Sequence, residues 1–518
     1  MDSNDAATLK KRPLAIKTTR SSPETEGHER ARKGGEGASN GEITEELEEP
    51  LSPAGRLFHQ PNFNCHIVAV MGIGKPIDVA VLKSGLEATL IRHPRFSSIQ
   101  LLDESKSKKA RWVRTKVNLD DHIIIPGVDP TASSSAPDKL VEDYVSSLST
   151  SPMDLSRPLW DLHVLNFPTS EAAAVIVLRI HHSLGDGTSL TSLLLACTRK
   201  SADPDALPSL ADLSRPRARP RRSRPASKNP LSFLLWLWAI FMLTWRTLID
   251  VAAFATTALF LKDTATPFTG AEGVEFRRKR FLHRTVELDD VKQIKNAMHC
   301  TVNDVLLGIT SFGLSKYLER KYGENNKKKL PTNIRMRSTL LVNIRPTPGI
   351  HALSDMMEEG KGKGSKWGNW LGYIILPFPV VMYEDPLDYI RKGKATADRK
   401  KNSLEAIFTY MSGDFIVKIF GIKAAAALCH RLLTHTTFSF SNIMGPVEEV
   451  AFYGHPIVYL APSVYGHPQA LTVHYQSYMN KVKIVIAVDD SVIPDPHQIL
   501  DDLAESLRII RDATATRL

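Results

Sequence analysis

A run of nine residues, AAAVIVLRI at 172–180, is apolar except for Arg179 and leads directly into HHSLGDG at 181–187. Because the run is apolar at odd and even positions alike, it predicts a strand whose two faces are both buried, which is typical of α/β folds. Gly185 and Gly187 predict a tight turn where this strand ends. The sequence therefore places two histidines and an aspartate at the end of a buried strand.

Residues 55–201 predict one α/β unit around that strand. Asn64–Val70 is apolar enough for another strand. Asp78 is expected to cap a helix whose apolar residues recur at helical spacing until Pro94 stops it. Three further elements are expected in this unit: a strand at 111–117, a helix at 142–148 and a strand at 160–166.

Residues 277–518 predict a second α/β unit. Its expected elements are a helix at 301–318 and strands at 340–344, 371–381 and 481–488. The last of these, KVKIVIAV, alternates as a strand should. The fold class is therefore α/β, with two halves joined by a connector at 202–276.

Residues 1–54 are predicted to be a disordered tail, because they are rich in Ser, Gly, Pro and charge and poor in apolar residues. No apolar segment follows the first residues, so we expect no cleaved secretory signal. The four cysteines lie far apart and include no CxxC pair, which favours reduced thiols in a protein that faces the cytosol.

The connector combines a basic and an apolar segment. Arginines and prolines alternate at 215–228, and the 15 residues of Leu231–Trp245 carry no charge. After Arg246 and Asp250, which are four residues apart and expected to pair on one helix face, a second apolar run covers Val251–Leu261. Each run is shorter than the roughly 20 residues that span a bilayer, whereas the two runs read continuously are long enough and would place Arg246 and Asp250 near mid-membrane.

We expect this connector to contact a membrane as a hairpin or as a helix in the plane of the interface, with its tryptophans at the boundary. A single crossing would separate two halves that must build one site. The alternative is a buried core helix with one ion pair. The net charge of +10 does not indicate a nucleic-acid partner, because the basic stretch is followed by lipid-like sequence instead of elements that read bases.

The histidine segment matches the pattern HHxxxDG, and it favours general base chemistry. An imidazole at the end of a strand can remove a proton from a hydroxyl that attacks a carbonyl, and we assign this role to His182. Asp186 is expected to fold back through the turn and fix the local backbone and the imidazole. A metal site would need further ligands, an acyl-serine would need GxSxG, and a pair of core histidines is the remaining alternative.

HHxxxDG, together with several other segments, resembles the plant wax ester synthase/diacylglycerol acyltransferase family within the superfamily of coenzyme A-dependent acyltransferases. The resemblance covers about Leu51 to the C-terminus and includes PLW at 158–160, ND at 303–304, VNIRP at 342–346, WGNWLGY at 367–373, SNIMGP at 441–446 and HYQSY at 474–478.

This resemblance implies two halves like chloramphenicol acetyltransferase, with mixed β-sheets flanked by helices and an active-site tunnel between them. Acyl-CoA would be the substrate that meets a fatty alcohol or diacylglycerol there, with no metal or other cofactor. His182, His181 and Asp186 would be catalytic. Four residues are expected to bind substrate: Gly187, Asn303, Asp304 and Asn442. Asn303 and Asn442 are amide donors or wall supports near the oxyanion, unless Asn303 only caps its helix.

The family's usual location implies the cytosolic face of the endoplasmic reticulum membrane, with the plasma membrane as the alternative. Two other functions stay open. One is a transferase for a different alcohol or amine acceptor. The other is a membrane-docked lipid-binding protein without catalytic activity, which the intact HHxxxDG disfavours.

Overall fold

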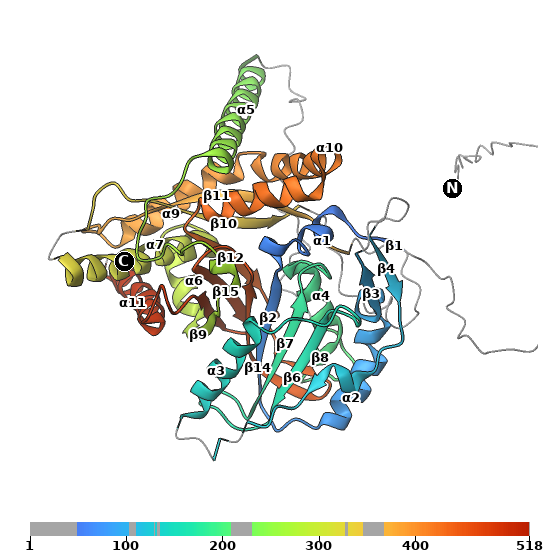
Figure 1. The fold of residues 1–518 in the computed structure, drawn as a ribbon. Coiled ribbons are helices and arrows are strands. Elements are labelled where there is room, and N and C mark those ends of the chain that lie inside the picture. Colours follow the sequence, from blue (N-terminus) through green and yellow to red (C-terminus); the bar gives the residue numbers. More distant parts are fainter. Residues whose placement is uncertain are drawn as a thin grey trace, which may run out of the picture. The chain divides into compact units, whose positions relative to one another are not determined.

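The structure, a computed structural model, describes residues 49–102, 110–128, 130–131, 135–208, 230–326, 330–344 and 367–516 (Figure 1). The basic stretch at 215–228, residues 345–346 of the VNIRP segment and the expected tail up to residue 48 lie outside these ranges. The last residues of that tail are structured. β1 (Glu49–Pro50) pairs with β4 (Arg111–Arg114), Leu51 is buried, and Ser52 caps α1 (Pro53–Leu57). Residues 49–54, which lie within the range expected to be a disordered tail, are therefore folded.

The first large sheet has seven strands in the order β5-β6-β7-β2-β14-β13-β8. Its strands are β2 (His66–Ile73), β5 (Ile123–Ile124), β6 (Trp160–Leu165), β7 (Ala174–His181), β8 (Thr198–Lys200), β13 (Val450–Phe452) and β14 (His455–Tyr465). All eight residues of β7 are buried, which confirms the strand predicted from its continuous apolar run. β5 and β6 are parallel and the other neighbours are antiparallel, so the sheet is mixed.

The second large sheet has six strands in the order β11-β10-β12-β15-β16-β9. Its strands are β9 (Arg280–Glu287), β10 (Arg335–Asn343), β11 (Leu371–Pro379), β12 (Phe438–Met444), β15 (Leu471–Tyr478) and β16 (Lys481–Val488). β12 is parallel to both of its neighbours and the remaining pairs are antiparallel. The expected α/β class with mixed sheets is confirmed. A small third sheet joins β1, β4 and β3 (Ser98–Leu101).

The two large sheets share chain across the predicted division at residues 201 and 276. β13 and β14 come from the second half of the sequence but pair with β8 and β2 in the first sheet. β14 also contacts β15 and β16 of the second sheet. The division itself stays a prediction, and this exchange of strands holds both sheets in one compact unit.

Helices cover the sheets (Figure 1). They are α2 (Val79–Ala88), α3 (Pro137–Ser149), α4 (Gly187–Ala196), α6 (Leu288–Ala297), α7 (Val302–Asn326), α9 (Leu387–Lys401) and α11 (Pro496–Ala515). Short 3-10 turns lie at Pro61–Phe63, Leu90–Arg92, Pro94–Ser97, Leu119–Asp121 and Val274–Phe276. Asp78 caps α2 as predicted, since its carboxylate accepts a hydrogen bond from the N–H of Ala80 (2.9 Å).

The apolar connector forms one continuous helix, α5 (Pro230–Leu259), so the expected hairpin is wrong. The expected pair of Arg246 with Asp250 is also wrong. The Asp250 carboxylate instead accepts hydrogen bonds from Arg399 (2.6 Å) and Lys400 (2.9 Å) at the end of α9, because Asp250 lies on the buried side of α5. The alternative of a buried core helix fails for most of α5, whose most apolar 18-residue window has a mean hydropathy of 1.5 and no buried residue.

A long helix that the sequence analysis did not predict, α10 (Glu405–Thr434), packs beside α5 (Figure 1). It bends at Gly421, where φ is +80°. Residues with a side chain rarely adopt that conformation, so glycine permits the bend. α10 also packs against β11 of the second sheet, next to the site described below.

Candidate active site

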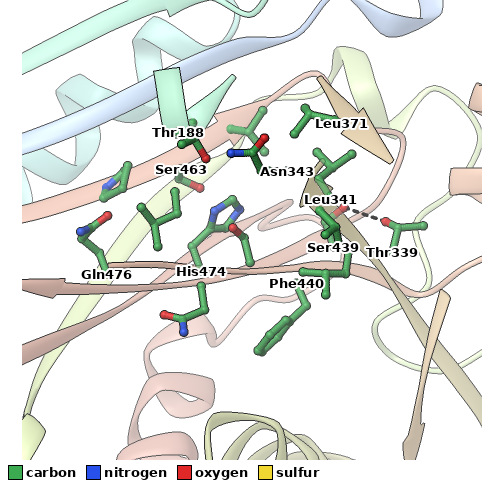
Figure 2. Close-up of a pocket in the computed structure, with 18 of the residues that line it drawn as sticks. Thr188, Thr339, Leu341, Asn343, Leu371, Ser439, Phe440, Ser463, His474 and Gln476 are labelled. Carbon is green, nitrogen blue, oxygen red and sulfur yellow. Dashed lines mark hydrogen bonds between the residues drawn. The ribbon is translucent and has the colours of Figure 1, made fainter. Parts of the chain in front are cut away.

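A cavity of about 520 Å³, which we call the central cavity, lies between the two large sheets. Figure 2 shows its walls: Thr188 of α4 and Ser463 of β14 approach from the side of the first sheet, and Thr339, Ser439 and His474 approach from the second. Most of the remaining lining is aliphatic, so the wall is mainly apolar, with polar groups that include Lys400 and Lys401 distributed over it. Such a lining suits a ligand with a long hydrocarbon part and a small reactive centre.

His182 lines this cavity just beyond the end of β7. Its backbone is held on both sides. The N–H donates to the carbonyl of Cys65 (2.9 Å), and the carbonyl accepts from the amide Nδ2 of Asn369 (3.0 Å). The imidazole stacks on the ring of Phe58, with centroids 4.2 Å apart. These contacts fix the ring at the cavity wall.

The environment of His182 keeps its imidazole neutral. Burial lowers its pKa below the ordinary value, against weaker opposing effects that include the charge of Asp186. A charged imidazolium loses its hydration in such a place, whereas the neutral ring loses little. His182 is therefore available to accept a proton at neutral pH.

His181 is adjacent in sequence but occupies a different environment. Its Nε2 donates to Oδ1 of Asn64 (2.9 Å), its Nδ1 accepts from the hydroxyl of Ser183 (2.6 Å), and its ring stacks on His59 at 4.3 Å. Burial holds its pKa well below the ordinary value. Nε2 therefore ties the end of β7 to the segment before β2, and Nδ1 holds the turn after β7 at Ser183, so the geometry gives His181 a supporting position.

Asp186 is fully buried and joins two parts of the chain. One carboxylate oxygen accepts from the N–H of Ser189 (2.9 Å) and so caps α4. The other accepts from the N–H of Trp370 (3.2 Å) in the segment before β11. Asp186 therefore positions the turn after His182 and ties it to the second half of the sequence.

Three of the four predicted substrate-binding residues line the central cavity: Gly187, Asn303 and Asn442. The Asn442 amide donates to Oδ1 of Asn303, which joins β12 to the start of α7. Asp304 does not line the central cavity. It is fully buried, its carboxylate accepts from the N–H of Thr301, and its own N–H donates to the Thr301 hydroxyl, which together form a capping box. Thr301 and Asp304 cap α7, so the alternative in which Asn303 is the cap is wrong.

The sequence analysis missed several polar residues of the site. His474 lines the central cavity, and burial lowers its pKa to about 4. His467 also lines it, with Nδ1 3.0 Å from the hydroxyl oxygen of Ser439 and a pKa lowered by burial to about 3. His474 belongs to the HYQSY segment noted for its resemblance. His467 carries no local signal, because only the packing of two sheets brings it near His182.

The site contains six histidines within a small region: His59, His66, His181, His182, His467 and His474. Burial lowers the pKa of each of them, so these histidines contribute little positive charge at neutral pH, and the cations on the cavity wall are Lys400 and Lys401 of α9. Within the described part of the chain, no group of three or more His, Cys, Asp or Glu side chains is arranged to hold a metal ion.

A second cavity of about 360 Å³, which we call the α10 cavity, adjoins the first. Leu371 and Tyr373 line both cavities. Asn369 lines the α10 cavity while its amide holds the carbonyl of His182. Ile416 and Val417 of α10 form part of its wall. His182 therefore lies near the junction of two apolar spaces.

Two glycines of the sequence segments named above stand where backbones approach closely. A Cβ on Gly372 would lie 2.0 Å from the carbonyl oxygen of Ala406 in α10, and one on Gly445 would lie 2.3 Å from the carbonyl oxygen of Ser477. No side chain fits there without a backbone shift. Gly372 thus allows α10 to pack directly on β11 beside both cavities.

The chain matches two models of one protein family. The wax ester synthase/diacylglycerol acyltransferase catalytic domain matches residues 58–306, and the WS/DGAT C-terminal domain matches residues 367–511. Among relatives from Arabidopsis thaliana, wax ester synthase/diacylglycerol acyltransferase 6 is 49% identical, covering 91% of this chain and 95% of its own. Wax ester synthase/diacylglycerol acyltransferase 4 is 50% identical, covering 91% of each chain.

Solved structures share the fold at low identity. A wax ester synthase/diacylglycerol acyltransferase from Marinobacter aquaeolei VT8 is 17% identical, with a TM-score of 0.56 over 90% of this chain and 100% of its own. The first condensation domain of the calcium-dependent antibiotic synthetase is 14% identical, with a TM-score of 0.53 over 91% of this chain and 97% of its own. With the relatives at about half identity over nearly the whole length, these matches show that the chain belongs to the wax ester synthase/diacylglycerol acyltransferase family.

Proposed function

We propose that this protein transfers a long-chain acyl group from acyl-CoA to the hydroxyl of a fatty alcohol, of diacylglycerol or of both, with His182 as the general base. The observation that carries the proposal is a buried His182, with its pKa lowered, on the wall of an apolar cavity between two sheets. The cavity offers hydrocarbon chains a lining, and the imidazole offers the acceptor hydroxyl a base.

The reaction follows from these positions. The acceptor oxygen attacks the thioester carbonyl while the neutral imidazole of His182 takes the hydroxyl proton. The tetrahedral intermediate then collapses, the carbon–sulfur bond breaks, and the departing thiolate receives the proton. The ester and coenzyme A leave, with atoms and charge balanced. Asn303 and Asn442 are proposed to contact the reacting groups from the opposite wall, near the developing oxyanion.

An acceptor panel tests the activity. The purified protein, supplied with radiolabelled long-chain acyl-CoA, is expected to make ester with a long-chain alcohol or with diacylglycerol, and little product with a matched amine. Preference for the amine, or for an alcohol of another class, would support the rival transferase. Binding of acyl-CoA with neither transfer nor hydrolysis would favour the catalytically inactive lipid-binding protein.

We further propose that α5 docks the protein on the cytosolic face of the endoplasmic reticulum, with the plasma membrane as the alternative. Exposed tryptophans on α5, Trp238 and Trp245, support contact with an interface. β7 precedes α5, β14 follows it, and both pair with β2. The segments before and after α5 therefore lie on the same side of the membrane. A second crossing that brought the chain back would have to include arginines of the basic stretch at 215–228, at a cost of about 2.5–3.5 kcal/mol for each arginine.

Glycosylation mapping tests this topology. An Asn-X-Thr acceptor sequence appended to either end of the chain is expected to remain unmodified in cells, because the modifying enzyme works in the lumen. Modification at one end alone would show that α5 crosses the bilayer. Modification at both ends would place the protein inside the lumen and contradict a cytosolic location. Cell fractionation then separates the endoplasmic reticulum from the plasma membrane.

A further inference from the structure

The first part of α10 exposes an apolar surface. Four residues with a spacing of four, Ile407, Met411, Phe415 and Ile419, lie along one side of the helix, with Phe408 and Phe420 beside them. We call these six residues the α10 stripe. Each is between 40% and 67% exposed. The spacing places them on one face, as in a helix that buries that face against another apolar phase.

The opposite face of α10 is already used, so the helix cannot turn to bury the stripe. The Thr409 hydroxyl oxygen accepts from the N–H of Tyr373 (2.9 Å), and the Glu405 carboxylate accepts from the N–H of Ile375 (3.1 Å). Thr409 and Glu405 are both buried. These bonds fix α10 on β11 and leave the stripe on the outward face.

The stripe continues toward the exposed apolar residues of α5. The N–H of Leu404, at the start of α10, donates to the hydroxyl of Thr247 in α5 (3.1 Å), and the two helices pack together. Figure 1 shows α5 rising from the body next to α10. Phe241 and Leu248 of α5 are exposed as well. Apolar surface gathered from two helices is characteristic of a binding face, because soluble monomers keep such patches small.

Charge at the edge of this surface favours an anionic lipid surface as the partner. Lys418 and Lys423 are exposed beside the stripe, and Lys418 forms an ion pair with Asp414 one turn earlier (2.6 Å), so Lys423 carries most of the net positive charge at this edge. Lysines in this position reach the headgroups while neighbouring apolar side chains enter the acyl region. A second protein chain would equally cover the apolar residues, but α5 already offers a long apolar helix suited to lipid, and the substrates of the proposed reaction dissolve in a bilayer.

We propose that the α10 stripe is a second membrane-binding surface, which together with α5 seats the α10 cavity against the bilayer. Ile416 and Val417 line that cavity from the inner side of the same helix segment. A lipid acceptor then enters beneath α10 and reaches His182 without crossing water. The route for the acceptor rests on the proposed acyl transfer, whereas the membrane contact stands on the exposed stripe.

Vesicle binding by the full chain tests the contact. The variant Met411→Ser with Phe415→Ser is compared with Ile125→Ser combined with Leu155→Ser. Exposure is similar in the two pairs, 64% and 58% against 60% and 54%, and none of the four residues lines either cavity. With vesicles of phosphatidylcholine and phosphatidylserine, the α10 variant is expected to bind at least about 10-fold more weakly than wild type. The control pair is expected to bind as wild type does.

Equal loss in both variants, or no loss in the α10 variant, would overturn the proposal. Sedimentation separates the other occupant: if wild type forms a dimer that Met411→Ser with Phe415→Ser breaks while vesicle binding is unchanged, the stripe is a subunit interface. This measurement needs no catalytic activity, so it judges the membrane contact even if the proposed transfer fails.

Kinetics test the route of the acceptor. The α10 variant is expected to raise the KM for a long-chain alcohol presented in vesicles by at least about 10-fold, in proportion to the lost binding. Its kcat/KM for a short, water-soluble alcohol is expected to match wild type. An equal loss with both alcohols would contradict entry from the bilayer. An absence of ester from wild type with either alcohol would instead contradict the proposed function.

Discussion

Replacing His182 with alanine is expected to lower the rate of ester formation by about 10²–10⁴-fold, the usual contribution of a general base. Without the imidazole, the proton of the acceptor hydroxyl can pass only to water, which is a much weaker base. Fold retention is expected, because the hydrogen bonds of His182 to Cys65 and Asn369 use its backbone only. Turnover of labelled acyl-CoA and thermal unfolding of the same preparation measure the two effects separately.

His474→Ala is the matched control, because this second neutral histidine lines the same cavity. We expect it to lose much less activity than the His182 variant. The reverse order would transfer the role of base to His474, and normal turnover by His182→Ala would refute the assignment outright.

The pH profile of the wild-type enzyme reports on the same residue. Burial lowers the pKa of His182, so its neutral form persists below pH 6.5. We expect kcat/KM to stay level as the pH falls through 6.5 and to decline only as it passes through the lowered pKa. A decline centred well above 6.5 would indicate another base.

Replacing Asp250 with alanine is expected to destabilise the fold by about 3 kcal/mol, at the lower end of the range for a broken buried ion pair. Asp250 is fully buried and contacts both Arg399 and Lys400. In the variant, Lys400 keeps its ion pair with Glu405 (2.6 Å). Arg399 is partly exposed, so water solvates its guanidinium and the loss of its partner costs less free energy. Thermal or urea unfolding followed by circular dichroism measures the loss.

Arg246→Ala is the control for that prediction. Local spacing on α5 predicted Arg246 as the partner of Asp250, whereas the structure places Arg399 and Lys400 there. The Arg246 variant is expected to change stability by less than about 0.5 kcal/mol, as surface substitutions usually do. Equal destabilisation by the two variants would restore the pair on α5 and contradict the arrangement described above.

The predictions that the structure confirms depend on interactions between residues close to one another in the sequence. The buried strand β7, the cap of α2 at Asp78 and the strand β16 each follow from residues within a few positions of one another, although β16 is buried on both faces beyond Lys481. Capping and hydropathy periodicity are local effects, so they are legible without the rest of the fold. The family resemblance added the prediction that the second half of the chain faces this strand across a tunnel.

From its own patterns, therefore, the sequence predicted the α/β class, the positions of several helices and strands, and the histidine segment at the end of a buried strand, whereas α10 and β14 went unpredicted. Tertiary structure alone decided that β14 joins the first sheet, that Asp250 pairs with α9, and that His182 faces a cavity while His181 is tied to Asn64 and Ser183. Apart from the contact of His181 with Ser183, each of these outcomes depends on groups many residues away along the chain. The packing of these distant groups determines which partner each side chain contacts, and the spacing of residues along the chain does not distinguish those partners.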